Sequence, residues 1–350
     1  MKSIYSRILL FTLLFSLFIA CQKVLDMNID SQPPRLVMYA HLQPDSLVAV
    51  FISSSVHILK RDSLIAVNAK VSLYENGNFI ETLTNTAFNK YVSNSFKPTI
   101  GNEYTITAEA EGYKTISGST KIPIQTEISK IDTFTQPINN SNAGNREQFV
   151  ISPTFTDPAE IGNYYCISIN TFDSIENMSY SQYVNTKYLL FEINSWGGDD
   201  FQLIDNNNTS LFGDISNYTI LSGNLYMSDI AINGKVVTFN LNIDDNYYFD
   251  PSNPNGLVTA VVKTKKIINE VSLKSISKDF FLYAKSKALY QSTNQDIFSE
   301  KVKVYNNVKN GFGLVSSESA SKKSITRYSK YIEYKTDTIN PKPMRQARFN

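Results

Sequence analysis

Hydrophobic and polar residues alternate with a period of two along most of this chain. Between residues 103 and 110, Tyr104 and Ile106 fall on one face while Thr105 and Thr107 fall on the other. This alternation is typical of a half-buried β-strand, and helical spacing is nearly absent. The pattern therefore predicts a mainly β protein.

Turn residues divide the first part of the chain into short strands. Asn76 and Gly77 separate two alternating runs between residues 70 and 83, and this dipeptide adopts the positive φ angles of a tight hairpin. Residues 36–52 have the pattern of an earlier strand pair. Short strands at this spacing predict an Ig-like or transthyretin-like β-sandwich over residues 32–125.

A second, larger β-rich domain is expected over residues 126–320. Here Asn233 and Gly234 join an apolar run at residues 229–232 to an alternating run at residues 235–243. The same turn chemistry predicts a second hairpin with these two runs as its arms.

One helix interrupts the strands, from about residue 278 to residue 291. Ser277 is a suitable N-cap, and Asp279 favours the positive end of the helix dipole. Apolar residues recur at helical spacing, so we expect the helix to pack on a sheet. This predicted stripe contains Phe280, Phe281, Ala284, Ala288 and Leu289.

A short apolar segment at residues 312–315 precedes a basic C-terminal segment, residues 321–350. The pattern predicts a solvated tail, and contact with an acidic partner or surface is the alternative. The cationic residues of the segment include Lys322, Lys323, Arg327, Lys342, Arg345 and Arg348.

The first residues have the order of a bacterial lipoprotein signal peptide. Lys2 and Arg7 precede an apolar run at residues 8–20, and Cys21 follows it immediately. We therefore predict that residues 1–20 are a cleaved leader and that Cys21 is the site of lipid attachment. A membrane-spanning helix is the alternative, but the run is shorter than the ~20 residues that a span needs.

Lipidation of Cys21 would hold the protein on a membrane. Each buried methylene of an acyl chain such as palmitate contributes ~0.8 kcal/mol, and stable attachment needs at least two signals. Gln22 stands where Asp would favour inner-membrane retention, so we predict the outer membrane. The cell surface is the expected face, the periplasmic face is the alternative, and residues 21–31 form a flexible tether.

Composition limits the classes of partner and of covalent cross-link. The formal net charge is +1, which implies no nucleic-acid partner. The chain has 2 cysteines, so lipidation of Cys21 leaves Cys166 without a disulfide partner. Cys166 lies in an apolar run, and we expect a buried, inert thiol there.

Motifs for catalysis are sparse. The chain contains 2 histidines, His41 in a predicted turn at residues 41–45 and His57 near a strand end. We expect ordinary surface or satisfied histidines at both positions. Since no nucleophile elbow, phosphate loop or zinc motif is present, we predict a non-enzyme with no catalytic residues, no metal and no cofactor.

Two acidic pairs leave alternatives open. Asp199 and Asp200, or Asp244 and Asp245, could serve a cell-surface hydrolase that uses paired carboxylates. The loops around them also offer oxygen ligands for calcium, although the spacing is not that of an EF-hand. Ordinary turn chemistry is the preferred interpretation of both loops.

Aromatic residues in the second domain suggest a ligand-binding surface. Trp196, Tyr247 and Tyr248 are accompanied by neighbouring Asn residues, and binding sites often combine aromatic platforms with directed amides. Burial in the core is the alternative for each of the three.

Five segments carry a resemblance to a known family. Their order behind the lipid-attachment motif is similar to that in outer-membrane lipoproteins of Bacteroidota that are grouped as domain-of-unknown-function family 4249. The segments are residues 34–40, 68–73, 101–106, 155–165 and 305–313.

This resemblance implies a function beside an outer-membrane nutrient importer, because genes for such lipoproteins tend to neighbour SusC-like TonB-dependent receptors. It brings no catalytic residues with it. The expected function is that of an accessory or ligand-capturing partner of the receptor. A carboxylate-dependent hydrolase and an envelope scaffold or adhesion module are the alternatives.

Overall fold

The structure is a computed structural model. It describes residues 33–56, 65–137, 147–175, 178–185, 191–194, 218–221, 224–243, 258–293, 300, 302–336 and 346–348. These residues form a mainly β protein with several sheets and one α-helix, as the alternation of the sequence predicts.

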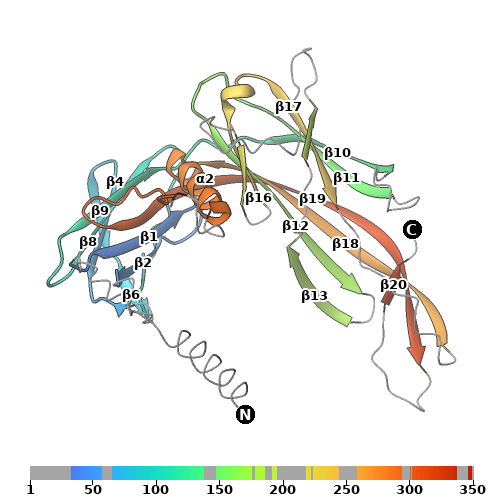
Figure 1. Ribbon diagram of the computed structural model, residues 1–350, viewed down its shortest axis with the longest axis horizontal. Helices are drawn as coiled ribbons and strands as arrows, with labels where there is room; N and C mark the ends of the chain where they lie inside the picture. The colour runs from blue at the N-terminus through green and yellow to red at the C-terminus, as the bar shows by residue number, and fades with distance from the viewer. Residues whose placement is uncertain are drawn as a thin grey trace, which may run out of the picture.

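The first unit is a sandwich of two sheets that face each other (Figure 1). Its strands are β1 (Leu36–Leu42), β2 (Ala49–Ser54), β3 (Ile65–Ala66), β4 (Lys70–Glu75), β5 (Asn78–Thr82), β6 (Thr84–Ala87), β7 (Lys90–Val92), β8 (Glu103–Glu109) and β9 (Ile116–Lys121). One sheet contains β1-β2-β7-β6 and the other β5-β4-β8-β9. Met38, Ile52, Leu73 and Ile106 are fully buried in one apolar core.

The local predictions for this unit are confirmed. Asn76 and Gly77 have φ angles of 48° and 82°, and β4 pairs with β5 across them. Strands β1 and β2 pair antiparallel, with Leu36 opposite Ser54. The φ angles and the strand periodicity are both set by a few neighbouring residues, which is why the sequence was sufficient here.

The second unit also has two facing layers of strands. Its strands are β10 (Ile128–Pro137), β11 (Glu147–Thr156), β12 (Tyr164–Ile175), β13 (Met178–Asn185), β14 (Phe191–Asn194), β15 (Tyr218–Leu221), β16 (Asn224–Ser228), β17 (Val236–Ile243), β18 (Val258–Ile276), β19 (Phe312–Thr336) and β20 (Gln346–Arg348). One layer has the order β10-β11-β17-β14, and the other has β15-β16-β12-β18-β19. Tyr165, Phe239 and Val271 fill the core between them.

Strand β19 joins the two units. It pairs antiparallel with β18 along nearly its whole length, and its first residues pair parallel with β1, with Met38 opposite Gly313. Figure 1 shows β18 and β19 leaving the sandwich side by side and running through the second unit. One continuous 12-stranded sheet therefore crosses both units.

The return of β19 also completes the first core. Val308 and Val315 are 3% and 0% exposed and belong to the apolar cluster of the sandwich. Residues 32–125 therefore pack with a segment that lies in the predicted second domain. Gly313 makes this approach possible, because its φ is +124° and a Cβ at this position would lie 1.9 Å from the carbonyl oxygen of Met38.

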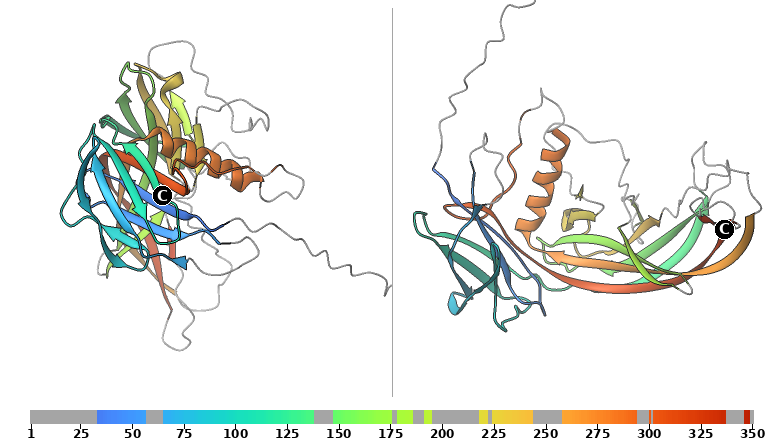
Figure 2. Two further views of the ribbon diagram at one scale, coloured as in Figure 1. Left: turned by 90° about the vertical axis from the view of Figure 1, so that its left-hand side faces the viewer. Right: turned by 90° about the horizontal axis from the view of Figure 1, so that it is seen from below.

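Helix α2 (Lys278–Thr293) lies where the two units meet (Figure 2). It confirms the predicted helix, and Ser277 Oγ accepts a hydrogen bond from the Phe280 amide at 3.4 Å. Phe281 and Ala284 are buried, whereas Leu289 is exposed because it lies outside the packed face. Among the described residues, no helix has the length and apolar character needed to cross a membrane.

The predicted hairpin across Asn233 and Gly234 is wrong. The sequence predicts one arm of a hairpin at residues 229–232, but Asp229–Ala231 is a short 3-10 helix, and β17 pairs with β11 and β14 instead. Gly234 does turn the chain, with a φ of +69°. Its turn connects the 3-10 helix to β17, and the Asp229 side chain accepts hydrogen bonds from the Gly162 and Asn163 amides.

The C-terminal segment also differs from the prediction. Residues 312–315 are not a short isolated segment, because they begin the 25-residue strand β19. The basic segment is not a solvated tail between residue 321 and Thr336. Its backbone is paired with β18 up to Thr336. Lys322 and Lys323 are both exposed within this strand, and as neighbours they point to opposite faces of it.

Candidate functional site

Polar side chains line one face of the sheet where β12, β18 and β19 lie side by side. The register places Ser168 opposite Ser272 and Ser272 opposite Lys322, with Lys274 two residues further along β18. Alternate residues of the same strands, such as Ile167 and Leu273, point into the apolar core. Because side chains alternate between faces, the polar residues are gathered on the opposite face.

These residues and two connecting segments of the first unit enclose a pocket. Gln43, Pro44 and Asp45 follow β1, and Gln125 lies between β9 and β10. The pocket has a volume of about 380 Å³, which falls within the ~300–1,000 Å³ of small-molecule sites. Both units therefore contribute to this junction pocket.

Ser272 supplies an uncompensated polar group at the base of the junction pocket. The residue is 1% exposed, and its Oγ has no hydrogen-bond partner among the described residues. A buried hydroxyl without a partner carries a desolvation cost of about 1–3 kcal/mol. A polar molecule in the pocket would remove this cost.

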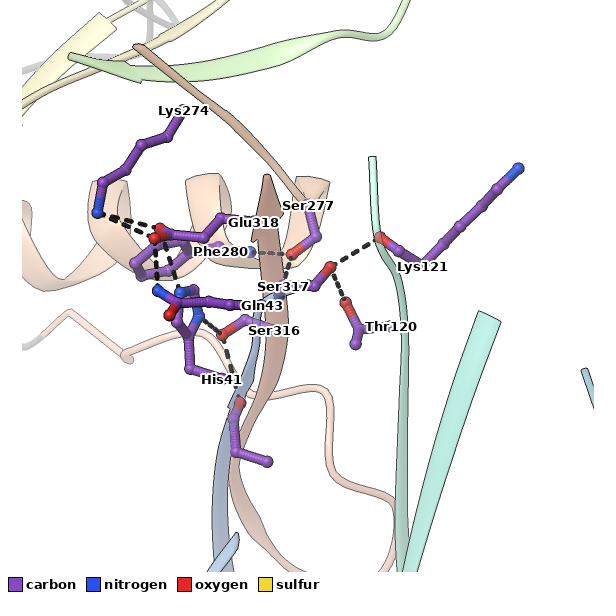
Figure 3. A network of polar contacts seen from close by, with 11 residues as sticks. His41, Gln43, Thr120, Lys121, Lys274, Ser277, Phe280, Ser316, Ser317 and Glu318 are labelled. Carbon is purple, nitrogen blue, oxygen red and sulfur yellow. Dashed lines mark hydrogen bonds and ion pairs between the residues drawn. The ribbon is translucent and has the colours of Figure 1, made fainter. Parts of the chain in front are cut away.

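A charged cluster that contains Glu318, His41 and Lys274 (Figure 3) contributes Glu318 and Lys274 to the lining of the same pocket. Glu318 is 3% exposed, and its Oε2 lies 3.1 Å from His41 Nε2. Its Oε1 lies 3.0 Å from Lys274 Nζ and accepts a hydrogen bond from Gln43 Nε2 at 2.6 Å. Strands β1, β18 and β19 each supply one member of this cluster.

The partners of Glu318 keep its carboxylate ionised. Burial by itself would raise the pKa of this group, because it disfavours the charged form. The hydrogen bond from His41 and the positive charge of Lys274 outweigh burial and lower the pKa to about 2. The carboxylate can accept hydrogen bonds, but it is not poised to donate a proton near neutral pH.

The position of His41 corrects a sequence prediction. It lies within strand β1 rather than in a turn, and the turn follows at Asp45, whose φ is 64°. His41 Nδ1 lies 2.9 Å from Ser316 Oγ, and its ring packs 4.8 Å from the ring of Phe280. It is therefore a satisfied histidine, one of the two expected environments, while His57 lies outside the described residues.

A serine-rich part of β19 fixes the cluster relative to the sandwich. Ser317 Oγ donates to the carbonyl of Lys121 at 2.7 Å, and Ser319 Oγ donates to the carbonyl of Pro123 at 2.9 Å. These residues alternate with Glu318 and point to the other face of the strand. The linker between the units is thereby held along β19.

The structure describes only some of the other residues that the sequence singled out. Cys166 is buried, and burial raises the pKa of its thiol to about 12, so the prediction of a buried thiol is confirmed. The remaining predicted residues lie outside the described residues: Cys21, Trp196, Tyr247, Tyr248, Asp199, Asp200, Asp244 and Asp245.

The motif at residues 155–165 has a structural explanation. Asp157 Oδ1 accepts a hydrogen bond from the Tyr165 hydroxyl at 2.5 Å, and its Oδ2 accepts one from the Gly234 amide at 2.9 Å. Asp229 Oδ2 accepts from the amides of Gly162 and Asn163, both at 2.8 Å. The two buried carboxylates therefore hold adjacent loops together.

Sequence reasoning missed the junction pocket. The alternation of Ser168, Ser272 and Lys274 with apolar neighbours was visible, but it predicts only that these residues lie opposite the core. In the part of the chain that the structure describes, no group of three or more His, Cys, Asp and Glu residues could hold a metal ion. The pocket is thus a site of hydroxyl, amide and paired charged groups.

Comparison with known proteins identifies a family for most of the chain. A family model described as "Domain of unknown function (DUF4249)" matches residues 22–324. The matched region contains the sandwich, the helix and the junction pocket. No curated protein matches the chain.

Proposed function

We propose that this chain, which belongs to the DUF4249 family of unknown function, is a non-enzymatic lipoprotein. It captures a polar ligand at the bacterial outer membrane. In this proposal the captured ligand is passed to a SusC-like TonB-dependent transporter. The junction pocket is the capture site, and Cys21 is the anchor.

The observation that carries the proposal is the unsatisfied Ser272 hydroxyl in a preformed pocket. Proteins rarely retain a buried polar atom without a partner; Ser272 Oγ is such an atom, and Ser272 is one of the residues that line a pocket of about 380 Å³. Glu318, the acidic member of the cluster, is held as a carboxylate by His41 and Lys274. This arrangement favours binding over proton transfer.

The N-terminal segment supports the proposed location. The apolar run at residues 8–20 and the adjoining Cys21 match the order of a lipoprotein leader. The tether at residues 21–31 would span roughly 15–20 Å as a flexible chain. Such a reach would let the folded units contact a neighbouring receptor while the lipid stays in the membrane.

The resemblance to lipoproteins of Bacteroidota supports the proposed partner. Genes of such lipoproteins tend to adjoin genes of SusC-like receptors, so a nutrient importer is the expected neighbour. We place the lipoprotein on the cell surface, where it would meet a ligand before the receptor does.

Co-purification in a mild detergent tests the partner. A tagged full-length chain, expressed in its native host, should bring a large β-barrel receptor with it. Repeated isolation of the chain without such a receptor, including after chemical cross-linking of intact cells, would contradict the proposal.

The anchor and the exposed face need separate measurements. Cys21→Ala should release the protein from the membrane fraction, and persistent membrane association would contradict lipid anchoring. Protease added to intact cells should remove the wild-type chain if it faces outward. Protection from the protease would instead place the chain on the periplasmic face.

A further inference from the structure

Both basic residues that line the junction pocket are paired with a carboxylate. Lys274 Nζ lies 3.0 Å from Glu318 Oε1, and Lys322 Nζ lies 3.2 Å from Glu270 Oε1. The lining carries two basic residues, Lys274 and Lys322, and two acidic residues, Asp45 and Glu318. A ligand with a strong net charge would meet no excess of opposite charge.

The uncharged lining groups can each donate and accept hydrogen bonds. Ser168 and Ser272 offer hydroxyls, and Asn224, Gln43 and Gln125 offer amides. A hydroxyl acts as donor and acceptor, and an amide presents both an NH₂ group and a carbonyl oxygen. Each hydroxyl group of a polyhydroxylated ligand can also donate and accept hydrogen bonds, so it can pair with any of these lining groups.

Apolar side chains contribute little to the lining. Among the residues that line the pocket, Pro44 and Ala320 are the apolar ones. A peptide with apolar side chains would therefore find few contacts for them, because such side chains gain most from apolar surroundings. The lining favours a ligand that is polar over most of its surface.

The residues that line the pocket range from buried to exposed. Ser272 is 1% exposed, whereas the Lys322 side chain is 55% exposed, and both residues line the pocket. Ser168 lies directly opposite Ser272 on the neighbouring strand. Two buried serines on neighbouring strands therefore lie side by side in the pocket lining.

We propose that the junction pocket binds an uncharged carbohydrate, and that Ser272 Oγ makes a hydrogen bond to one of its hydroxyl groups. This inference rests on the proposed function, because it specifies the ligand of the same capture site. The bound sugar satisfies the hydroxyl that the protein leaves without a partner. Ser168 and Asn224 complete the polar contacts at the base.

The test uses the purified chain from Gln22 to Asn350 and a defined set of probes. The probes are neutral hexasaccharides of glucose, xylose, mannose or galactose, a hexasaccharide of uronic acids, and an uncharged hexapeptide. Titration calorimetry should detect binding of at least one neutral saccharide, with no binding of the uronic-acid saccharide or the peptide.

Two variants connect the binding to the pocket. Ser272→Ala should weaken binding by about 3- to 10-fold, the effect of one lost neutral hydrogen bond. It should leave the unfolding temperature unchanged or raise it, because Ser272 Oγ has no partner in the protein. Ser117→Ala is the matched control, since Ser117 lies on β9 and outside the pocket lining, and it should bind as the wild type does.

Three results would overturn the inference. These are binding of none of the neutral saccharides, binding of the charged saccharide or the peptide in their place, or unchanged saccharide binding by Ser272→Ala. Each result is independent of receptor co-purification. A receptor-associated chain that binds no sugar would refute the ligand class alone, whereas a sugar-binding chain without a receptor would refute the proposed transport partner.

Discussion

His41 Nε2 lies 3.1 Å from Glu318 Oε2, so the first long strand of the chain is joined to its last long strand by a contact between an imidazole and a buried carboxylate. Lys274 approaches the same carboxylate from β18. The side chain of Glu318 is 4% exposed, and charges at such a depth interact strongly when they are paired. The cluster therefore fixes the relative position of three strands at the junction of the two units.

Glu318→Gln should lower the free energy of unfolding by about 2–3 kcal/mol, because it removes the charge that compensates Lys274 in a mostly buried cluster. Urea denaturation followed by tryptophan fluorescence or circular dichroism measures the change. Glu111→Gln is the matched control on an exposed turn and should change stability by less than about 0.5 kcal/mol. Equal effects of the two substitutions would contradict the structural importance of the cluster.

The stabilisation by Glu318 should depend on pH. Its pKa is about 2 in the folded protein, against 4.5 for an unperturbed carboxyl. A depressed pKa stabilises the fold fully above the unperturbed pKa, and this contribution is lost as the pH falls from about 4.5 through about 2. The stability difference between wild type and Glu318→Gln should therefore shrink over this window, and a difference that stays constant there would refute the assignment.

Gly313→Ala should strongly destabilise the chain. The substitution would force a side chain into a backbone with a φ of +124° and place its Cβ 1.9 Å from the carbonyl oxygen of Met38. We expect a loss of about 3 kcal/mol or more in urea denaturation. Gly112 also has a positive φ, +78°, but an added Cβ would meet no atom of a non-adjacent residue within 4 Å, so Gly112→Ala should cost only about 1 kcal/mol.

The Cys166 thiol should be unreactive in the native protein. Its burial raises the pKa to about 12, so almost no thiolate is present near neutral pH. In the chain from Gln22 to Asn350, Cys166 is the remaining cysteine, and a thiol reagent such as dithiobis(nitrobenzoate) should report less than about one tenth of the thiol. Addition of concentrated urea should expose one thiol per chain, whereas rapid reaction of the native protein would show that the site is open.

Tyr165→Phe should test the structural explanation of the motif at residues 155–165. It removes the hydroxyl that donates to Asp157 Oδ1 at 2.5 Å and leaves a buried acceptor without this partner. The expected loss is about 1–3 kcal/mol. Tyr328→Phe, at a side chain that is 71% exposed, should have almost no effect, and the saccharide affinity of both variants should equal that of the wild type.

Much of the local structure could be predicted from the sequence. The alternation around Tyr104 and Ile106, the hairpin at Asn76-Gly77 and the helix that begins after Ser277 are all present as expected. Each depends on side-chain periodicity or backbone preference over a few residues. The buried Cys166 followed from the same reasoning, because its apolar neighbours mark a core strand.

The long-range pairings could not be predicted in this way. Nothing near Gly313 in the sequence indicates that its strand lies beside Met38 in a parallel pair, and the pairing of the same strand with β18 makes the expected basic tail a strand up to Thr336. The register of a long strand depends on the packing of the whole sheet, so it is not encoded in any short segment.

The sequence by itself determined the mainly β class, the local turns, the helix and the polar face of the strands that carry Ser168 and Ser272. Only the tertiary structure decided that these serines lie opposite each other, that Glu318 meets His41 and Lys274, and that a pocket forms between the units. The physical reason is the range of the interactions involved. Backbone preference and side-chain alternation act between neighbours, whereas a binding pocket requires side chains from distant segments to be brought together by the core.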